Sequence, residues 1–169
     1  MPSNFYMWFI AALIPIFVGG IYYHEKVFGS AWMRTNGFKA SDLEGGNMAV
    51  ILGISYFLGL LIAANLTGIV IHQTNVFQMM MPDVAEAGNA AQDQFANLMT
   101  QYEDRYRTPG HGLLHGGALA LLFVMPVIAI NSLFERRGWK YVAIHTGYWF
   151  ITLGAMGALL CATIEYAPL

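Results

Sequence analysis

The feature that most constrains the fold of this chain is the spacing of its charged residues. Four apolar stretches of roughly 20 residues or more contain no Asp, Glu, Lys or Arg. Such a run is typical of a transmembrane helix, because about twenty residues at about 1.5 Å each cross the roughly 30 Å hydrocarbon core. The stretches cover about residues 5–23, 47–71, 110–134 and 141–164. The sequence therefore predicts an integral membrane protein.

The composition agrees with this prediction and sets the fold class. Only 11% of the 169 residues are charged, against roughly a quarter in a soluble domain, and 57% are hydrophobic. The apolar runs do not alternate as barrel strands do, so helices must satisfy the backbone in lipid. We expect an all-α, four-helix bundle forming a single transmembrane domain over residues 1–169. Four short spans enclose little besides their own side chains, so we also expect a homo-oligomer.

Several partners and chemistries are excluded at this stage. The formal net charge is −2 and no basic tract is present, which argues against nucleic acid. A single cysteine, Cys161, excludes an intrachain disulfide and a cysteine-based metal cluster. The partners that the sequence still allows are the lipid bilayer and another membrane protein. No nucleophile–base arrangement or nucleotide-binding glycine motif is found in a suitable context, so the sequence does not predict an enzyme.

No Lys or Arg precedes the first apolar stretch, and no small-residue cleavage site follows it, so we expect it to be retained rather than removed as a signal peptide.

The loops predict an orientation. The first and third loops contain Lys26, Arg34, Lys39, Arg136, Arg137 and Lys140. The central segment contains only Arg105 and Arg107. The positive-inside rule then places both termini outside the cytoplasm.

The central segment between the second and third stretches has the pattern of an amphipathic helix over about residues 83–106. Apolar residues recur there at steps of three and four: Val84, Ala91, Phe95, Leu98, Met99, Tyr102 and Tyr106. We expect this helix to lie across the outer end of the bundle as a lid, with burial of Phe95 and Leu98. A face for docking a partner is the alternative.

Small residues and prolines indicate how the spans pack. Association in lipid depends on close packing, so ridges of small residues are natural contact surfaces. Two such ridges are present, one in each of the last two stretches: Gly112, Gly116 and Gly117, and Gly154, Gly157 and Ala158. Pro15 and Pro126 lie within stretches, where we expect kinks.

Histidines provide the candidate site. His111 and His115 are four residues apart, so both rings lie on one face of a helix. In the predicted topology His72 ends the second stretch and Glu165 follows the fourth. Both therefore lie on the outer side of the membrane, at a depth similar to that of His111 and His115. Two histidines at this spacing with one more ligand are typical of a site for zinc or a related divalent metal. Interhelical hydrogen bonding and a proton relay are the alternatives that the residues leave open.

Two blocks of the chain resemble a known family. The first comprises Asn4-Phe5, Gly19-Gly20-Ile21-Tyr22-Tyr23, Val27-Phe28-Gly29 and Trp32-Met33, and the second Asn131–Arg137 and Gly147-Tyr148-Trp149. Both are similar to the domain-of-unknown-function 1761 family. The resemblance implies a small bacterial multi-pass membrane protein without an assigned activity, and it assigns no site residues.

Three functions are consistent with these observations. The first is a non-enzymatic binding or transport bundle with a histidine cluster at its outer end. The second is a structural or accessory subunit of another membrane protein, and the third is a histidine-dependent membrane enzyme. The first predicts that His72, His111, His115 and Glu165 face one another, the second that they face apart, and the third that a cavity lies beside them.

Overall fold

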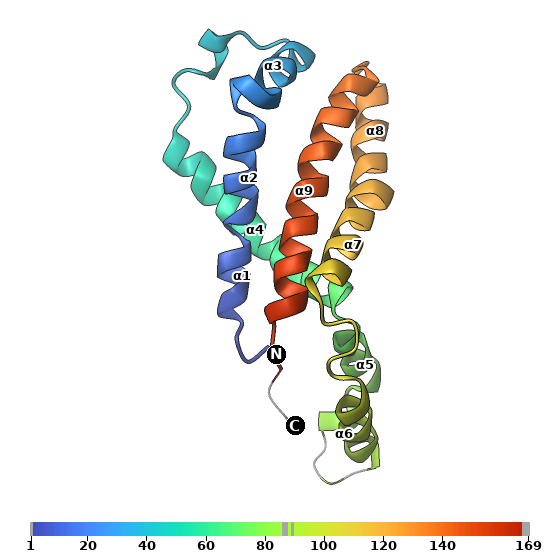
Figure 1. Ribbon diagram of the computed structural model, residues 1–169. Helices are drawn as coiled ribbons and strands as arrows, with labels where there is room; N and C mark the ends of the chain where they lie inside the picture. The colour runs from blue at the N-terminus through green and yellow to red at the C-terminus, as the bar shows by residue number, and fades with distance from the viewer. Residues whose placement is uncertain (1, 86–87, 89, 167–169) are drawn as a thin grey trace.

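The computed structural model describes residues 2–85, 88 and 90–166, and the fold is all-helical, as predicted (Figure 1). The helices are, in chain order, α1 Tyr6–Ala11, α2 Ile14–Tyr22, the π-helix η1 Glu25–Gly29, α3 Ser30–Asn36, the 3₁₀-helix η2 Ala40–Leu43, α4 Met48–Val70, α5 His72–Met80, the 3₁₀-helix η3 Asp83–Ala85, α6 Ala90–Tyr102, α7 Pro109–Leu119, the π-helix η4 Ala120–Val124, α8 Met125–Phe134 and α9 Trp139–Thr163.

Three helical stretches are long and apolar enough to cross a membrane. They are Met48–Val70, Pro109–Phe134 and Trp139–Thr163, and they agree with three of the predicted spans to within two residues. A fourth span is present if the bent pair Tyr6–Tyr22 and Glu25–Asn36 is counted as one. These helices indicate a membrane protein.

The N-terminal stretch differs from the prediction at its end. The sequence predicts a span that stops at Tyr23, but the helical path continues as a second arm, Glu25–Asn36, at 57° to Tyr6–Tyr22. His24 makes the bend with an extended backbone, and its Nδ1 accepts a hydrogen bond from the Lys26 N–H at 3.2 Å. The second arm contains charged residues, which is why hydropathy alone ended the helix too early.

The two prolines lie at helix irregularities, as expected. Pro15 is in the first turn of α2, directly after the break that separates α2 from α1. Pro126 is in the first turn of α8, and the π-helix η4 precedes it. Proline has no N–H and cannot complete the bond to the preceding turn, so the backbone changes its helical geometry at these points.

Helix α9 is the centre of the molecule. Half of its most apolar window is buried, against 17% for α4 and 22% for the α7–α8 stretch. Figure 1 shows α9 between α1–α2 and α7–α8, while α4 crosses the other helices obliquely. A regular four-helix bundle is therefore not confirmed, because α4 is tilted away from the common direction of the other stretches.

Glycines bring α7 and α9 into backbone contact. A Cβ at Gly112 would overlap the carbonyl group of Gly157, and a Cβ at Gly116 would overlap that of Leu153. These two contacts define what we call the glycine seam. The predicted ridges of small residues thus pack within one chain, and they fix the height at which α7 begins relative to α9.

The central segment is a hairpin of two helices rather than a single lid helix. Helix α6 begins at Ala90 and packs against α5, beyond the end of the apolar helices (Figure 1). Phe95 of α6 is 8% exposed and meets Phe77 of α5 edge to face at 5.6 Å between ring centroids. Leu98, expected to be buried, is 38% exposed. Phe95 of the apolar stripe thus packs against α5, a helix that the sequence did not predict. Residues 86, 87 and 89 of the predicted helix lie outside the described residues.

Candidate functional site

The start of α7 fixes two of the predicted ligands. Thr108 caps this helix, and its Oγ1 accepts a hydrogen bond from the His111 N–H at 3.3 Å. Pro109 follows in the first turn, where its missing N–H costs no helical hydrogen bond. His111 and His115 are therefore one turn apart near the end of the helix, and their ring centroids are separated by 4.4 Å.

A break between α4 and α5 brings in the third ligand. Helix α4 ends at Val70, Ile71 is extended (φ −118°, ψ 100°), and α5 begins at His72. Ile71 is 1% exposed, so packing holds the break in place. His72 thereby faces α7. Its Nε2 forms a hydrogen bond with the Nε2 of His111 at 3.0 Å, in which the tautomers decide which ring donates, and its ring centroid lies 5.1 Å from that of His115.

His72, His111 and His115, which we call the histidine cluster, form a group of side chains that could hold a metal ion. One nitrogen from each ring lies within 4.8 Å of the other two. Nitrogens that share a tetrahedral zinc at 2.0–2.1 Å are about 3.3–3.4 Å apart, which lies between the 3.0 Å of the His72–His111 pair and the 4.8 Å limit of the cluster. His72 is exposed and the other two are half-buried, which leaves the cluster open to solvent on one side.

The fourth predicted ligand, Glu165, is not part of the group that the structure brings together. Helix α9 ends at Thr163, and the chain beyond it is extended and tied to the N-terminal segment. The Glu165 N–H donates to Asn4 Oδ1 at 2.9 Å, and its carbonyl oxygen accepts from the Ser3 N–H at 2.8 Å. The prediction grouped Glu165 with the histidines because all four lie at a similar depth in the membrane. Depth does not specify, however, on which side of α9 the chain continues after the helix ends.

Tyr106 is a contact of the cluster that the sequence analysis missed. Its ring stacks on that of His111, with centroids 5.0 Å apart and an interplanar angle of 17°, and it meets His72 edge to face at 6.2 Å. Its backbone has φ +64°, which is rare for a residue with a side chain. In the sequence it is only one more member of the apolar stripe, so no pattern distinguishes it.

The segment around Tyr106 is fastened to α5 and to the end of α9. Gln73 Nε2 donates to the carbonyl oxygens of Tyr102, Glu103 and Arg105 at 2.7, 3.1 and 3.1 Å. Other bonds reach α9 and the residues after it: from Cys161 Sγ to the Tyr106 carbonyl, from Arg107 Nη2 to the Ile164 carbonyl, and between Thr74 and Tyr166. Burial raises the pKa of the Tyr166 phenol.

The histidines at the opposite end do not form a comparable group among the described residues. His145 Nδ1 lies 3.3 Å from the Tyr23 hydroxyl, while its Nε2 is buried without a partner. His24 Nδ1 is occupied by the Lys26 N–H. The Glu135 carboxylate at this end pairs with Arg137 at 2.8 Å.

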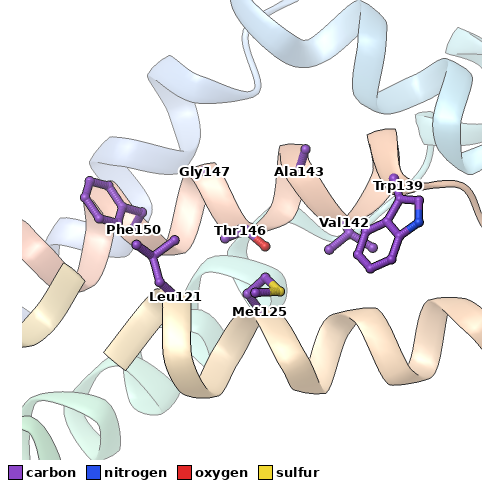
Figure 2. A pocket seen from close by; sticks show the side chains of 8 residues that line it. All are labelled: Leu121, Met125, Trp139, Val142, Ala143, Thr146, Gly147 and Phe150. Atoms are coloured by element: carbon purple, nitrogen blue, oxygen red, sulfur yellow. The ribbon is translucent and has the colours of Figure 1, made fainter. Parts of the chain in front are cut away.

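An open apolar groove of about 610 Å³ lies between the α7–α8 stretch and α9. It is lined by Leu121, Met125, Trp139, Val142, Ala143, Thr146, Gly147 and Phe150 (Figure 2). None of these residues belongs to the histidine cluster, which lies at the other end of α7. The cavity that a histidine-dependent enzyme requires beside the cluster is therefore not provided by this groove.

Comparison with known proteins gives one result. No curated protein and no solved structure matches the chain. A family model described as "Protein of unknown function (DUF1761)" matches residues 6–161. That range contains the four predicted spans almost entirely, the α5–α6 hairpin and all three residues of the histidine cluster. The chain thus belongs to the DUF1761 family.

Proposed function

We propose that this chain is a multi-pass membrane protein that binds a divalent transition metal ion, zinc foremost, through His72, His111 and His115. The observation that carries the proposal is the convergence of three imidazole nitrogens within 4.8 Å of one another. Two of the ligands come from one turn of α7, and the third is 39 residues away in the chain. Folding, rather than sequence proximity, brings them together.

The donor set selects the class of ion. Imidazole nitrogen suits zinc, copper, nickel and iron, whereas calcium and magnesium prefer oxygen ligands. Three neutral imidazoles leave the charge of the ion uncompensated and one tetrahedral position vacant for water or an anion. The exposed side of His72 gives solvent access to that position. A site with a vacant, solvent-accessible position is suited to reversible binding of an ion, whereas a structural site has all four positions filled by the protein.

The distribution of basic residues supports a location for this site. The loops with Lys26, Arg34, Lys39, Arg136, Arg137 and Lys140 follow α2 and α8, at the end of the molecule opposite to both termini (Figure 1). The positive-inside rule assigns that end to the cytoplasm. In this proposal the protein resides in a bacterial inner membrane with both termini outside, and the histidine cluster meets ions from the outer side.

An accessory role in an oligomer or in a larger membrane complex is the second candidate. It is favoured by α4, of which only 17% is buried in the most apolar window. Lipid or another protein covers this helix in the membrane. The two candidates are compatible if the ion site serves an assembly. Chemical cross-linking in membranes, followed by gel electrophoresis, distinguishes a homo-oligomer from a complex with a second protein.

Calorimetric titration of the purified, metal-free protein in detergent with Zn²⁺ tests the proposal. We expect one ion per chain for the wild type, and a loss of binding for His115→Ala and for His72→Ala. His24→Ala is the matched control, because His24 lies at the other end of the molecule; Glu165→Gln is a second control, and both should bind as the wild type does. An absence of stoichiometric binding by the wild type, or unchanged binding after His115→Ala, would overturn the proposal.

A further inference from the structure

The histidine cluster has a neighbour whose conformation requires an explanation. Tyr106 lies in the segment between α6 and α7, and its ring covers one face of His111. Its φ of +64° is a conformation in which Cβ is crowded by the backbone, so asparagine or glycine is the usual occupant. A backbone of this kind persists only when the surroundings enforce it, and such residues gather at ligand sites.

Hydrogen bonds on both sides enforce the conformation of Tyr106. Gln73 holds the segment before it through three carbonyl oxygens. The Tyr106 carbonyl oxygen itself accepts from the Thr108 N–H at 2.9 Å and from Cys161 Sγ at 3.3 Å. Arg107, the next residue, binds the Ile164 carbonyl. The backbone of Tyr106 is thus fixed to α5, α7 and α9 at once.

Packing of the ring does not account for this arrangement. Tyr106 is 59% exposed, so its side chain contributes little apolar burial. Within the part of the chain that the structure describes, its ring contacts two of the three candidate ligands, His111 and His72. A nearly parallel stack favours one plane of the His111 ring over others. In that plane the His111 Nε2 points at the Nε2 of His72, at 3.0 Å.

We infer that Tyr106 is a positioning residue of the metal centre: its ring holds the His111 imidazole in the plane from which it shares an ion with His72 and His115. This inference rests on the proposed function. Residues that orient a ligand from outside the coordination sphere commonly change metal affinity about 10- to 100-fold when they are replaced. The aromatic ring is the required part, and the hydroxyl is not.

The test is the Zn²⁺ affinity of three variants, measured by competition with a chromophoric chelator. We expect Tyr106→Phe to bind as the wild type does, and Tyr106→Leu to bind about tenfold more weakly. Tyr106→Gly should also bind more weakly, while the Tm of its metal-free form does not fall, because glycine adopts φ +64° without crowding. A purely structural role predicts the opposite, namely that stability and affinity fall together. Tyr102→Leu is the matched control, since the ring of Tyr102 lies under Arg105.

A second readout separates this inference from the proposed function. The visible spectrum of bound Co²⁺ reports ligand geometry, and we expect it to change in Tyr106→Leu and to stay unchanged in Tyr106→Phe. If the wild type binds Zn²⁺ and Tyr106→Leu has the same affinity and the same Co²⁺ spectrum, the inference is wrong and the proposed function stands. If the wild type does not bind Zn²⁺, both are wrong.

Discussion

At the scale of single residues, the three histidines differ in how firmly they are held. His111 and His115 are part of α7, which the glycine seam joins to the central helix. His72 is the first residue after a break and is the exposed member of the cluster. If the cluster binds an ion as proposed, closure on it would move mainly His72, so replacement of His72 should affect the rate of ion capture as well as the affinity.

The proposed zinc affinity should depend steeply on pH. Imidazole binds metal only when neutral, and its ordinary pKa is about 6.5, so protons compete with the ion below that value. Affinity should be constant above about pH 7.5 and fall below about pH 6, because protons then compete with the ion for the imidazole nitrogens. Chelator competition between pH 5 and 8 measures this, and His24→Ala should give the same curve. An affinity that does not change between pH 8 and pH 5 would contradict ligation by imidazole.

The residue scale also shows where prediction from sequence succeeds. The i, i+4 spacing of His111 and His115 specifies a shared helical face, because the periodicity of a helix is fixed. The approach of His72 followed from topology alone. Glu165 and Tyr106 were misjudged or missed for one reason: each lies in an irregular segment, where hydrogen bonds to distant residues such as Asn4 and Cys161 decide the direction of the chain.

At the scale of elements, the glycine seam determines where α7 stands. A methyl group at Gly116 would meet the backbone of α9 rather than a flexible side chain. Backbone cannot yield without separating the two helices. The glycine seam therefore helps to position the histidine cluster, because α7 carries two of its three residues.

Gly116→Ala should destabilise the protein by about 1–3 kcal/mol, as overpacking of a close contact does. The Tm in detergent should fall, and the Zn²⁺ affinity should fall with it. Gly110→Ala is the matched control: it lies in the same helix, and a Cβ there meets nothing within 4 Å. Equal Tm values for the two variants would show that α7 and α9 are not in backbone contact.

The α5–α6 hairpin should depend on Phe95 and be insensitive to Leu98. Burial of a phenylalanine side chain contributes about 1.5–3 kcal/mol, and Phe95 is 8% exposed, against 38% for Leu98. Phe95→Ala should therefore increase amide hydrogen exchange throughout α5 and α6, whereas Leu98→Asp should leave exchange unchanged. Rapid exchange in Leu98→Asp would instead favour the lid that the sequence predicts.

At the scale of the whole molecule, the sequence predicts the spans better than their arrangement. Hydropathy locates α4, α7–α8 and α9 because lipid imposes a length and a composition on each span separately. The tilt of α4 and the central place of α9 depend on which faces meet. Those contacts involve backbone surfaces such as Gly112 against Gly157, which hydropathy does not describe.

The orientation can be tested with single cysteines. Ser3 and Lys140 are exposed and lie at opposite ends of the molecule, so Ser3→Cys should react with an impermeant maleimide in intact spheroplasts and Lys140→Cys should not. Cys161 is fully buried, so the wild type is the unreactive control. The reverse labelling pattern would place the histidine cluster on the cytoplasmic side.

The central place of α9 has a consequence for how the molecule is made. Of the spans described, α9 is the last to leave the ribosome, yet the α7 glycines have their contacts on it. Until α9 is synthesised, the glycines of α7 lack the backbone that they contact. The α7–α9 contact can therefore form only after α9 is synthesised. A nascent chain halted at Trp139 should leave the α7 glycines without the surface on which they pack.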